Sequence, residues 1–123
     1  MRVKYAIVFV SDMERSVAFY RDVFGLPLRF ESPGWSEFAT EGATLALHLA
    51  ESPPASENPG GLERAGTCRW GFGVPDLDAF HRRMIAQGVR CLQEPQTVFG
   101  ARLAQYADPD GLTISVGEHR EDR

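Results

Sequence analysis

The sequence predicts an α+β fold of two β-α-β-β-β modules in a single domain, 1–123, and three observations carry this prediction. First, the chain has 123 residues, of which 43% are hydrophobic and 24% charged, as is typical of one globular domain. Second, Val-Ser-Asp-Met at residues 10–13 returns as Val-Pro-Asp-Leu at residues 74–77. Third, each copy follows an apolar run and opens a stretch with helical spacing. We expect the modules to form a curved mixed sheet, with the helices outside and a concave ligand cleft inside.

Module one is predicted to span residues 1–50 and to begin with a strand. A helix should follow, because apolar residues recur at i, i+4, i+7 and i+11 from Met13 onwards. Ser11 and Glu14 have the spacing of a capping box at the start of this helix. Gly25 stands where the helix is expected to stop.

Three short strands are predicted to complete module one. Their expected ranges are residues 26–31, 36–40 and 43–49. Turn-forming residues separate them, with Ser-Pro-Gly at residues 32–34 and Glu-Gly at residues 41–42. Trp35 directly follows the first of these turns, and we expect it to belong to that turn.

Module two is predicted to span residues 67–118 and to repeat the same order. Its helix should be capped by Asp76 and should stop at Gly88. The apolar stripe of this helix is expected to consist of Leu77, Phe80, Met84 and Ile85. A linker at residues 51–66, rich in Pro and Gly, should separate the modules, and a charged tail should follow at residues 119–123.

The strands of module two are expected at residues 89–93, 101–107 and 112–117. A break is predicted around Glu94 and Pro95, because proline cannot donate to a ladder of hydrogen bonds. The sequence Asp-Pro-Asp-Gly at residues 108–111 is a strong turn signal, since proline fixes φ and glycine accepts a positive φ.

Composition excludes several classes of function. The net charge of −4 leaves no general basic surface for nucleic acid. No apolar run approaches the roughly 18 residues that a membrane span needs, so we expect no membrane partner. Two cysteines, Cys68 and Cys91, are too few for a disulfide framework. We therefore expect a reduced, cytoplasmic protein.

The repeat resembles the vicinal oxygen chelate superfamily, also called glyoxalase/bleomycin resistance/dioxygenase proteins. Residues 10–20, Val-Ser-Asp-Met-Glu-Arg-Ser-Val-Ala-Phe-Tyr, are similar to the opening V-x-D-x-x-x-S-x-x-F-Y of that family. Phe-Gly-Leu at residues 24–26 and the Asp-Pro-Asp-Gly turn strengthen the resemblance. It implies the fold expected above and a homodimer, while the scaffold serves many different reactions.

The resemblance also implies four positions for metal ligands, on the first and last strand of each module. In this sequence they look like Tyr5, His48, Arg69 and Ser115. Only His48 is a good ligand, because arginine keeps its proton and neutral hydroxyl groups bind divalent ions poorly. One imidazole cannot replace the three or four donors of a metal site. We therefore expect no metal and no other cofactor.

Strand alternation places the same four residues on the face away from the helices, where they could bind a small molecule. Arg69 could pair with an anion or stack on an aromatic ring, while Tyr5, His48 and Ser115 could exchange hydrogen bonds with a ligand. Trp35 could stack on a planar ligand. The sequence thus favours metal-independent binding of a small, anionic or planar aromatic molecule, as in the drug-sequestering bleomycin resistance branch. It assigns no catalytic residue.

An enzyme is the alternative hypothesis. A metal-dependent lyase, isomerase or dioxygenase would need non-standard ligands and a divalent metal. His48 with Glu51, Glu118 or His119 would be the residues to consider. A second form of the enzyme hypothesis is metal-free acid–base catalysis by Tyr5 and His48, which no other residue of the sequence supports. A third hypothesis is a structural member of the family that neither binds nor reacts.

Overall fold

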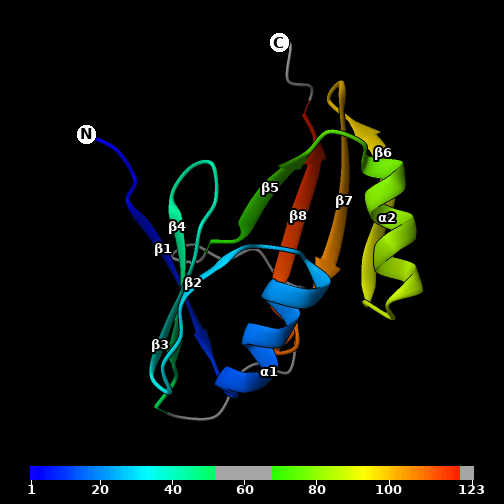
Figure 1. Cartoon of the computed structure of the whole chain (residues 1–123). Coiled ribbons are helices and arrows are strands. Elements are labelled where there is room, and N and C mark those ends of the chain that lie inside the picture. The colour runs from blue at the N-terminus through cyan, green and yellow to red at the C-terminus, as the bar shows by residue number, and fades with distance from the viewer. Residues whose placement is uncertain (52–67, 120–123) are drawn as a thin grey trace. The chain divides into compact units, whose positions relative to one another are not determined.

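The computed structural model of the chain describes residues 1–51 and 68–119, which belong to two compact units. Unit 1 is Met1–Ala55 and unit 2 is Ser56–Arg123. Each unit has one helical region and four strands in the same order, so the predicted β-α-β-β-β repeat is confirmed (Figure 1). The predicted linker and tail lie outside the described residues, except for Glu51 and His119.

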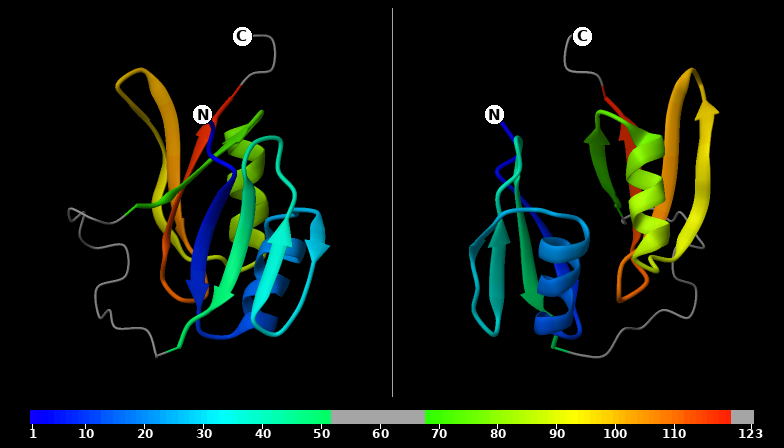
Figure 2. Two further views of the ribbon diagram at one scale, coloured as in Figure 1. Left: turned by 90° about the vertical axis from the view of Figure 1, so that its left-hand side faces the viewer. Right: turned by 45° about the vertical axis from the view of Figure 1, so that its right-hand side comes forward.

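Unit 1 is a four-stranded mixed sheet with a helix on one face. Its strands are β1 (Tyr5–Val10), β2 (Leu28–Phe30), β3 (Trp35–Phe38) and β4 (Thr44–Leu49), in the order β1-β4-β3-β2. β1 runs parallel to β4, and the other neighbours are antiparallel. The helix α1 (Met13–Ala18) continues into a π-helical stretch, η1 (Phe19–Val23), and packs on β3 and β4 (Figure 2). The sheet face away from α1 is called the open face of unit 1 below.

Unit 2 repeats this topology. Its elements are β5 (Trp70–Val74), α2 (Leu77–Ala86), β6 (Cys91–Val98), β7 (Ala101–Ala107) and β8 (Thr113–Glu118). The sheet order is β5-β8-β7-β6, again with one parallel pair, β5 and β8. The helix α2 packs on β6, β7 and β8. Neither α1 nor α2 has the length and apolar character that a bilayer span requires.

Each unit buries its own hydrophobic core between helix and sheet. In unit 1 the fully buried apolar side chains include Val10, Val17, Tyr20, Phe38, Leu45 and Leu47. In unit 2 they include Leu77, Met84, Tyr106, Ile114 and Val116. The predicted stripe of the first helix is confirmed. In the second helix Ile85 is an exception, since it lies about 100° further round the helix than Met84 and is 50% exposed.

The helix ends follow from local chemistry. Asp12, and not Ser11, is the N-cap of α1, and its Oδ1 accepts a hydrogen bond from the Arg15 backbone N–H at 3.1 Å. The predicted capping box is therefore wrong by one residue. Asp76 caps α2 in the same way, as predicted, at 3.0 Å from the Ala79 nitrogen. Gly25 and Gly88 follow the helices with φ of +85° and +78°, values that favour glycine.

Two predictions about strands are wrong. Trp35 is the first residue of β3 rather than part of a turn. β6 runs through Pro95 without a break. It can do so because β6 is an edge strand and its register with β7 shifts on both sides of Gln93, so the missing N–H of proline costs no regular ladder bond.

Candidate functional site

The open face of unit 1 carries a group of ring side chains. The register pairs Phe9 with His48 and His48 with Trp35, so three neighbouring strands contribute one row of rings. Tyr5 lies on the same face of β1, separated from Phe9 by Ile7. Below, Tyr5, Phe9, Trp35 and His48 together are called the aromatic face.

The rings of the aromatic face contact one another. The centroids of Phe9 and His48 are 5.1 Å apart, those of Trp35 and His48 are 6.0 Å apart, and those of Tyr5 and Trp35 are 6.2 Å apart. The last two pairs meet edge to face, an arrangement that the ring quadrupoles favour. Phe9 is nevertheless 63% exposed, and Tyr5 and Ile7 are also exposed. Since a solvated sheet face normally carries polar side chains, this apolar face indicates a binding surface.

Trp35 is held in place at both its backbone and its side chain. The Ser32 hydroxyl accepts a hydrogen bond from the Trp35 N–H at 3.1 Å and donates one to the Trp35 carbonyl at 2.6 Å. The indole Nε1–H donates to Glu37 Oε2 at 2.8 Å. Because these bonds fix the plane of the indole, a flat ligand would meet a ring that is already oriented.

His48 is fixed in one tautomer when its ring is neutral. Its Nδ1 lies 2.8 Å from the Leu49 carbonyl oxygen, which can only accept, so Nδ1 carries the proton. Nε2 is then a hydrogen-bond acceptor at the aromatic face. The imidazole can therefore receive a hydrogen bond from a ligand as well as contact it through the ring.

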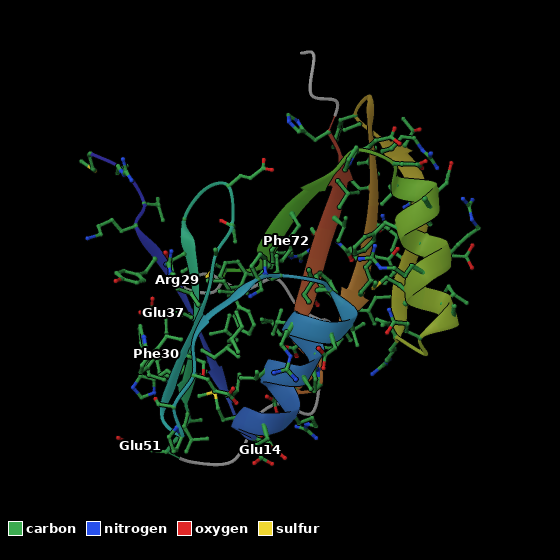
Figure 3. The ribbon with its side chains drawn as sticks, viewed as in Figure 1. Glu14, Arg29, Phe30, Glu37, Glu51 and Phe72 are labelled. Carbon is green, nitrogen blue, oxygen red and sulfur yellow. The ribbon has the colours of Figure 1, made fainter. Side chains whose placement is uncertain are left out.

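An ion pair lies beside the aromatic face. Arg29 Nη2 is 3.6 Å from Glu37 Oε1, and Arg29 also donates to the Thr44 hydroxyl. Figure 3 labels Arg29, Phe30 and Glu37 on the side of the sheet away from α1. Neither Arg29 nor Glu37 was among the site residues predicted from the sequence. For Glu37 the signal was present, because it alternates with the buried Ser36 and Phe38 along β3.

The predicted site residues divide between the two units. Tyr5, His48 and Trp35 come together in unit 1, whereas Arg69 and Ser115 belong to unit 2. Ser115 is half-buried in β8, and Arg69 is half-buried just before β5. The expected concave cleft combines both units, so a site that contains all five residues stays a prediction.

The strand register shows that two of the four ligand positions implied by the family resemblance are not equivalent in the repeat. His48 pairs with a residue four positions after Tyr5, whereas Ser115 pairs with a residue two positions after Arg69. The residue of unit 1 equivalent to Ser115 is therefore Ala46, and His48 corresponds to a glycine of unit 2. His48 and Ser115 are thus not equivalent positions of the repeat.

The donors do not fit the metal site that the family resemblance implies. Within the described residues of either unit taken by itself, 1–51 or 68–119, no three His, Cys, Asp or Glu side chains lie close enough together to hold an ion. Glu118, one of the alternative ligands, accepts a hydrogen bond from the Leu77 backbone N–H at 3.1 Å and so caps α2. Glu51 and His119 are exposed. A catalytic metal needs at least three protein donors, and His48 supplies one.

The titratable groups near α2 are not arranged as an activated nucleophile. Burial raises the pKa of Cys91, which keeps this thiol protonated. Cys91 pairs with Tyr106 across β6 and β7, and Tyr106 is fully buried. The Tyr106 hydroxyl lies 2.9 Å from His81 Nδ1. These groups therefore form part of the packing between α2 and its sheet.

Comparisons with known proteins agree with this fold. The family model Glyoxalase/Bleomycin resistance protein/Dioxygenase superfamily matches residues 2–116. The phenazine antibiotic resistance protein EhpR of Enterobacter agglomerans is 30% identical over 111 residues, which are 89% of this chain and 86% of EhpR. The metallothiol transferase FosB of Lysinibacillus sphaericus (strain C3-41) is 33% identical over 55 residues, which are 45% of this chain and 39% of FosB.

Solved structures share the architecture. TioX from Micromonospora sp. ML1 aligns with a TM-score of 0.76 at 21% sequence identity. The alignment covers 97% of this chain and 99% of TioX. At this identity the likeness concerns the fold alone. With the family model matching nearly the whole sequence, the chain belongs to the glyoxalase/bleomycin resistance protein/dioxygenase superfamily.

Proposed function

We propose that this protein binds a planar aromatic small molecule on the aromatic face of unit 1, without a metal ion. The observation that carries the proposal is the oriented indole of Trp35, bonded to Glu37 and flanked by Tyr5 and His48. Flat rings gain dispersion and quadrupole attraction from such a surface, and exposed apolar area is removed from water when they bind.

The relationship to EhpR suggests a first probe. EhpR is a phenazine antibiotic resistance protein, and phenazines are flat tricyclic aromatic molecules. Binding such a molecule would sequester it without any chemical step. The sequence assigns no catalytic residue. In addition, few good metal donors are found among Tyr5, His48, Arg69 and Ser115. Both points favour this mode of action over a metal-dependent enzyme.

The proposal is tested by equilibrium dialysis of the full chain against phenazine. We expect Trp35→Ala to weaken binding roughly tenfold or more, since one ring contact and its buried area contribute about 1.4 kcal/mol or more. Trp35→Phe keeps a ring and should lose less. Trp70→Phe is the matched control, because Trp70 lies in unit 2, and it should bind as the wild type does. Absent binding, or equal binding by Trp35→Ala, would refute the proposal.

We further propose that the protein acts in the cytoplasm as a homodimer. Cys68 and Cys91 are free cysteines, which suits a reducing compartment. The dimer is what the family resemblance implies. Light scattering on the purified protein measures its mass directly, and a mass of one chain would reject the dimer.

A further inference from the structure

The two carboxylate oxygens of Glu37 have different surroundings. Oε2 accepts the indole N–H of Trp35 at 2.8 Å. Oε1 makes no hydrogen bond within the part of the chain that the structure describes, and its nearest cation is Arg29 Nη2 at 3.6 Å. The Glu37 side chain is only 21% exposed. Oε1 is not shut off from solvent, so it is an acceptor that a donor from outside the chain can reach.

Arg29 balances the charge of Glu37 without using the acceptor. Its guanidinium donates to the Thr44 hydroxyl and lies beyond hydrogen-bond distance from Oε1. The pair therefore has no net charge, and a free ion of either sign gains little from it. What remains is a directional acceptor at the edge of the Trp35 ring. Because the same carboxylate accepts the indole N–H through Oε2, this acceptor lies beside the ring edge, where a donor on the edge of a stacked flat molecule can reach it.

From this arrangement we infer that the ligand of the aromatic face is a neutral planar heteroaromatic that bears an N–H donor, such as an aromatic amine, and that Glu37 Oε1 accepts this hydrogen bond. The inference rests on the proposed function and names the class of its ligand. Glu37 has two roles in it. It positions Trp35 through Oε2, and it selects the ligand through Oε1.

The test uses three probes with the same tricyclic ring: phenazine, 2-aminophenazine and phenazine-2-carboxylate. Wild-type protein should bind 2-aminophenazine roughly tenfold more tightly than phenazine, since a hydrogen bond to a charged acceptor is worth about that factor or more. The carboxylate should bind no more tightly than phenazine, because Oε1 cannot donate to it.

Glu37→Gln is the decisive variant. Its amide oxygen can still accept the indole N–H, but the NH₂ group then replaces Oε1, so an acceptor becomes a donor. The preference for 2-aminophenazine over phenazine should fall to about one. Glu41→Gln makes the same chemical change at an exposed residue of the same unit and should keep the preference. Circular dichroism and a thermal melt of each variant check that the fold is retained.

Other results overturn the inference in distinguishable ways. If phenazine binds through Trp35 but the amine has no advantage, or if Glu37→Gln keeps the advantage, the proposed function stands and the role of Oε1 is wrong. If the carboxylate binds most tightly and Arg29→Met removes this preference, Arg29 is the selecting group. If none of the three probes binds, the proposed function and this inference fall together.

Discussion

Tyr106 shows how one buried side chain links stability to pH. Its ring is fully buried beneath α2, and its hydroxyl contacts His81 Nδ1 at 2.9 Å. Burial, and to a smaller extent the nearby Cys91, raises the pKa of Tyr106 to about 12. The folded protein thus keeps this phenol neutral at a pH where an exposed tyrosine has ionised.

This raised pKa predicts a loss of stability in alkali. Above pH 10 the unfolded chain releases the phenol proton while the folded chain retains it up to about 12, so unfolding becomes more favourable as the pH rises through this window. Urea unfolding at a series of pH values should show the free energy of unfolding falling above pH 10. Tyr106→Phe should reduce this fall. An identical pH dependence in both proteins would contradict the assignment.

The sequence could predict the sheet face on which a single site residue lies, but not the contacts between site residues. Alternation along one strand places Tyr5 and His48 on the face away from the helix without knowledge of any partner. The contacts of Trp35 with Glu37, and of Glu37 with Arg29, depend on how β2, β3 and β4 are aligned. Register is a property of two strands together, so a single sequence leaves those contacts open.

Among the elements, the turn between β7 and β8 is fixed by one carboxylate. Asp108 is 4% exposed, and its Oδ1 accepts hydrogen bonds from the backbone N–H groups of Asp110 and Leu112, both at 2.9 Å. Gly111 completes the turn with φ of +87°. The turn brings β7 and β8 into their antiparallel register.

Removing this acceptor should destabilise unit 2. Asp108→Ala leaves two backbone N–H groups without their partner, which costs about 2–3 kcal/mol of the free energy of unfolding. Asp108→Asn keeps an oxygen acceptor and should lose about half as much. Urea unfolding of the three proteins measures both values. A loss of less than about 0.5 kcal/mol in Asp108→Ala, the size of an ordinary surface change, would show that the turn forms without this side chain.

Elements were predictable where the local signal is strong. β7 has the predicted limits 101–107, because turn residues bound it on both sides. The end of β4 at Leu49 also matches, and the other strand limits differ from those expected by one to five residues. The largest difference is β6, which ends at Val98 rather than residue 93. Pro95 predicted a break there, but β6 lies at the edge of its sheet, where a strand can contain a proline, and a single sequence does not show which strand is at an edge.

At the scale of the whole molecule, the repeat has kept its topology while its two sheets carry different chemistry. Unit 1 presents Phe9 and His48 at positions where unit 2 has glycine. Unit 2 has Ser115 where unit 1 has Ala46. Conservation of the hydrophobic pattern suffices to preserve a fold, so the repeat predicted the architecture but could not assign the chemistry of each face.

The donor set predicts how the whole chain responds to metals. After incubation with nickel, zinc, iron or manganese and then dialysis, we expect elemental analysis to find well under one ion per chain. The reason is that His48 is the one good ligand among the four positions implied by the family resemblance. A chelator should leave phenazine binding unchanged. One tightly held ion per chain would instead restore the metal-dependent enzyme as the leading hypothesis.

The irregular outer strands of the two sheets have a consequence for the behaviour of many copies together. β2 has three residues and a register shift, and β6 has two register shifts and Pro95. A strand from another molecule needs a long, regular row of N–H and C=O groups to pair with. Neither β2 nor β6 offers one, so each sheet resists extension by a neighbouring chain at this one of its two edges, whereas its other edge strand, β1 or β5, is regular. The same irregularities therefore protect the protein from aggregation along these edges while it folds in a crowded cell.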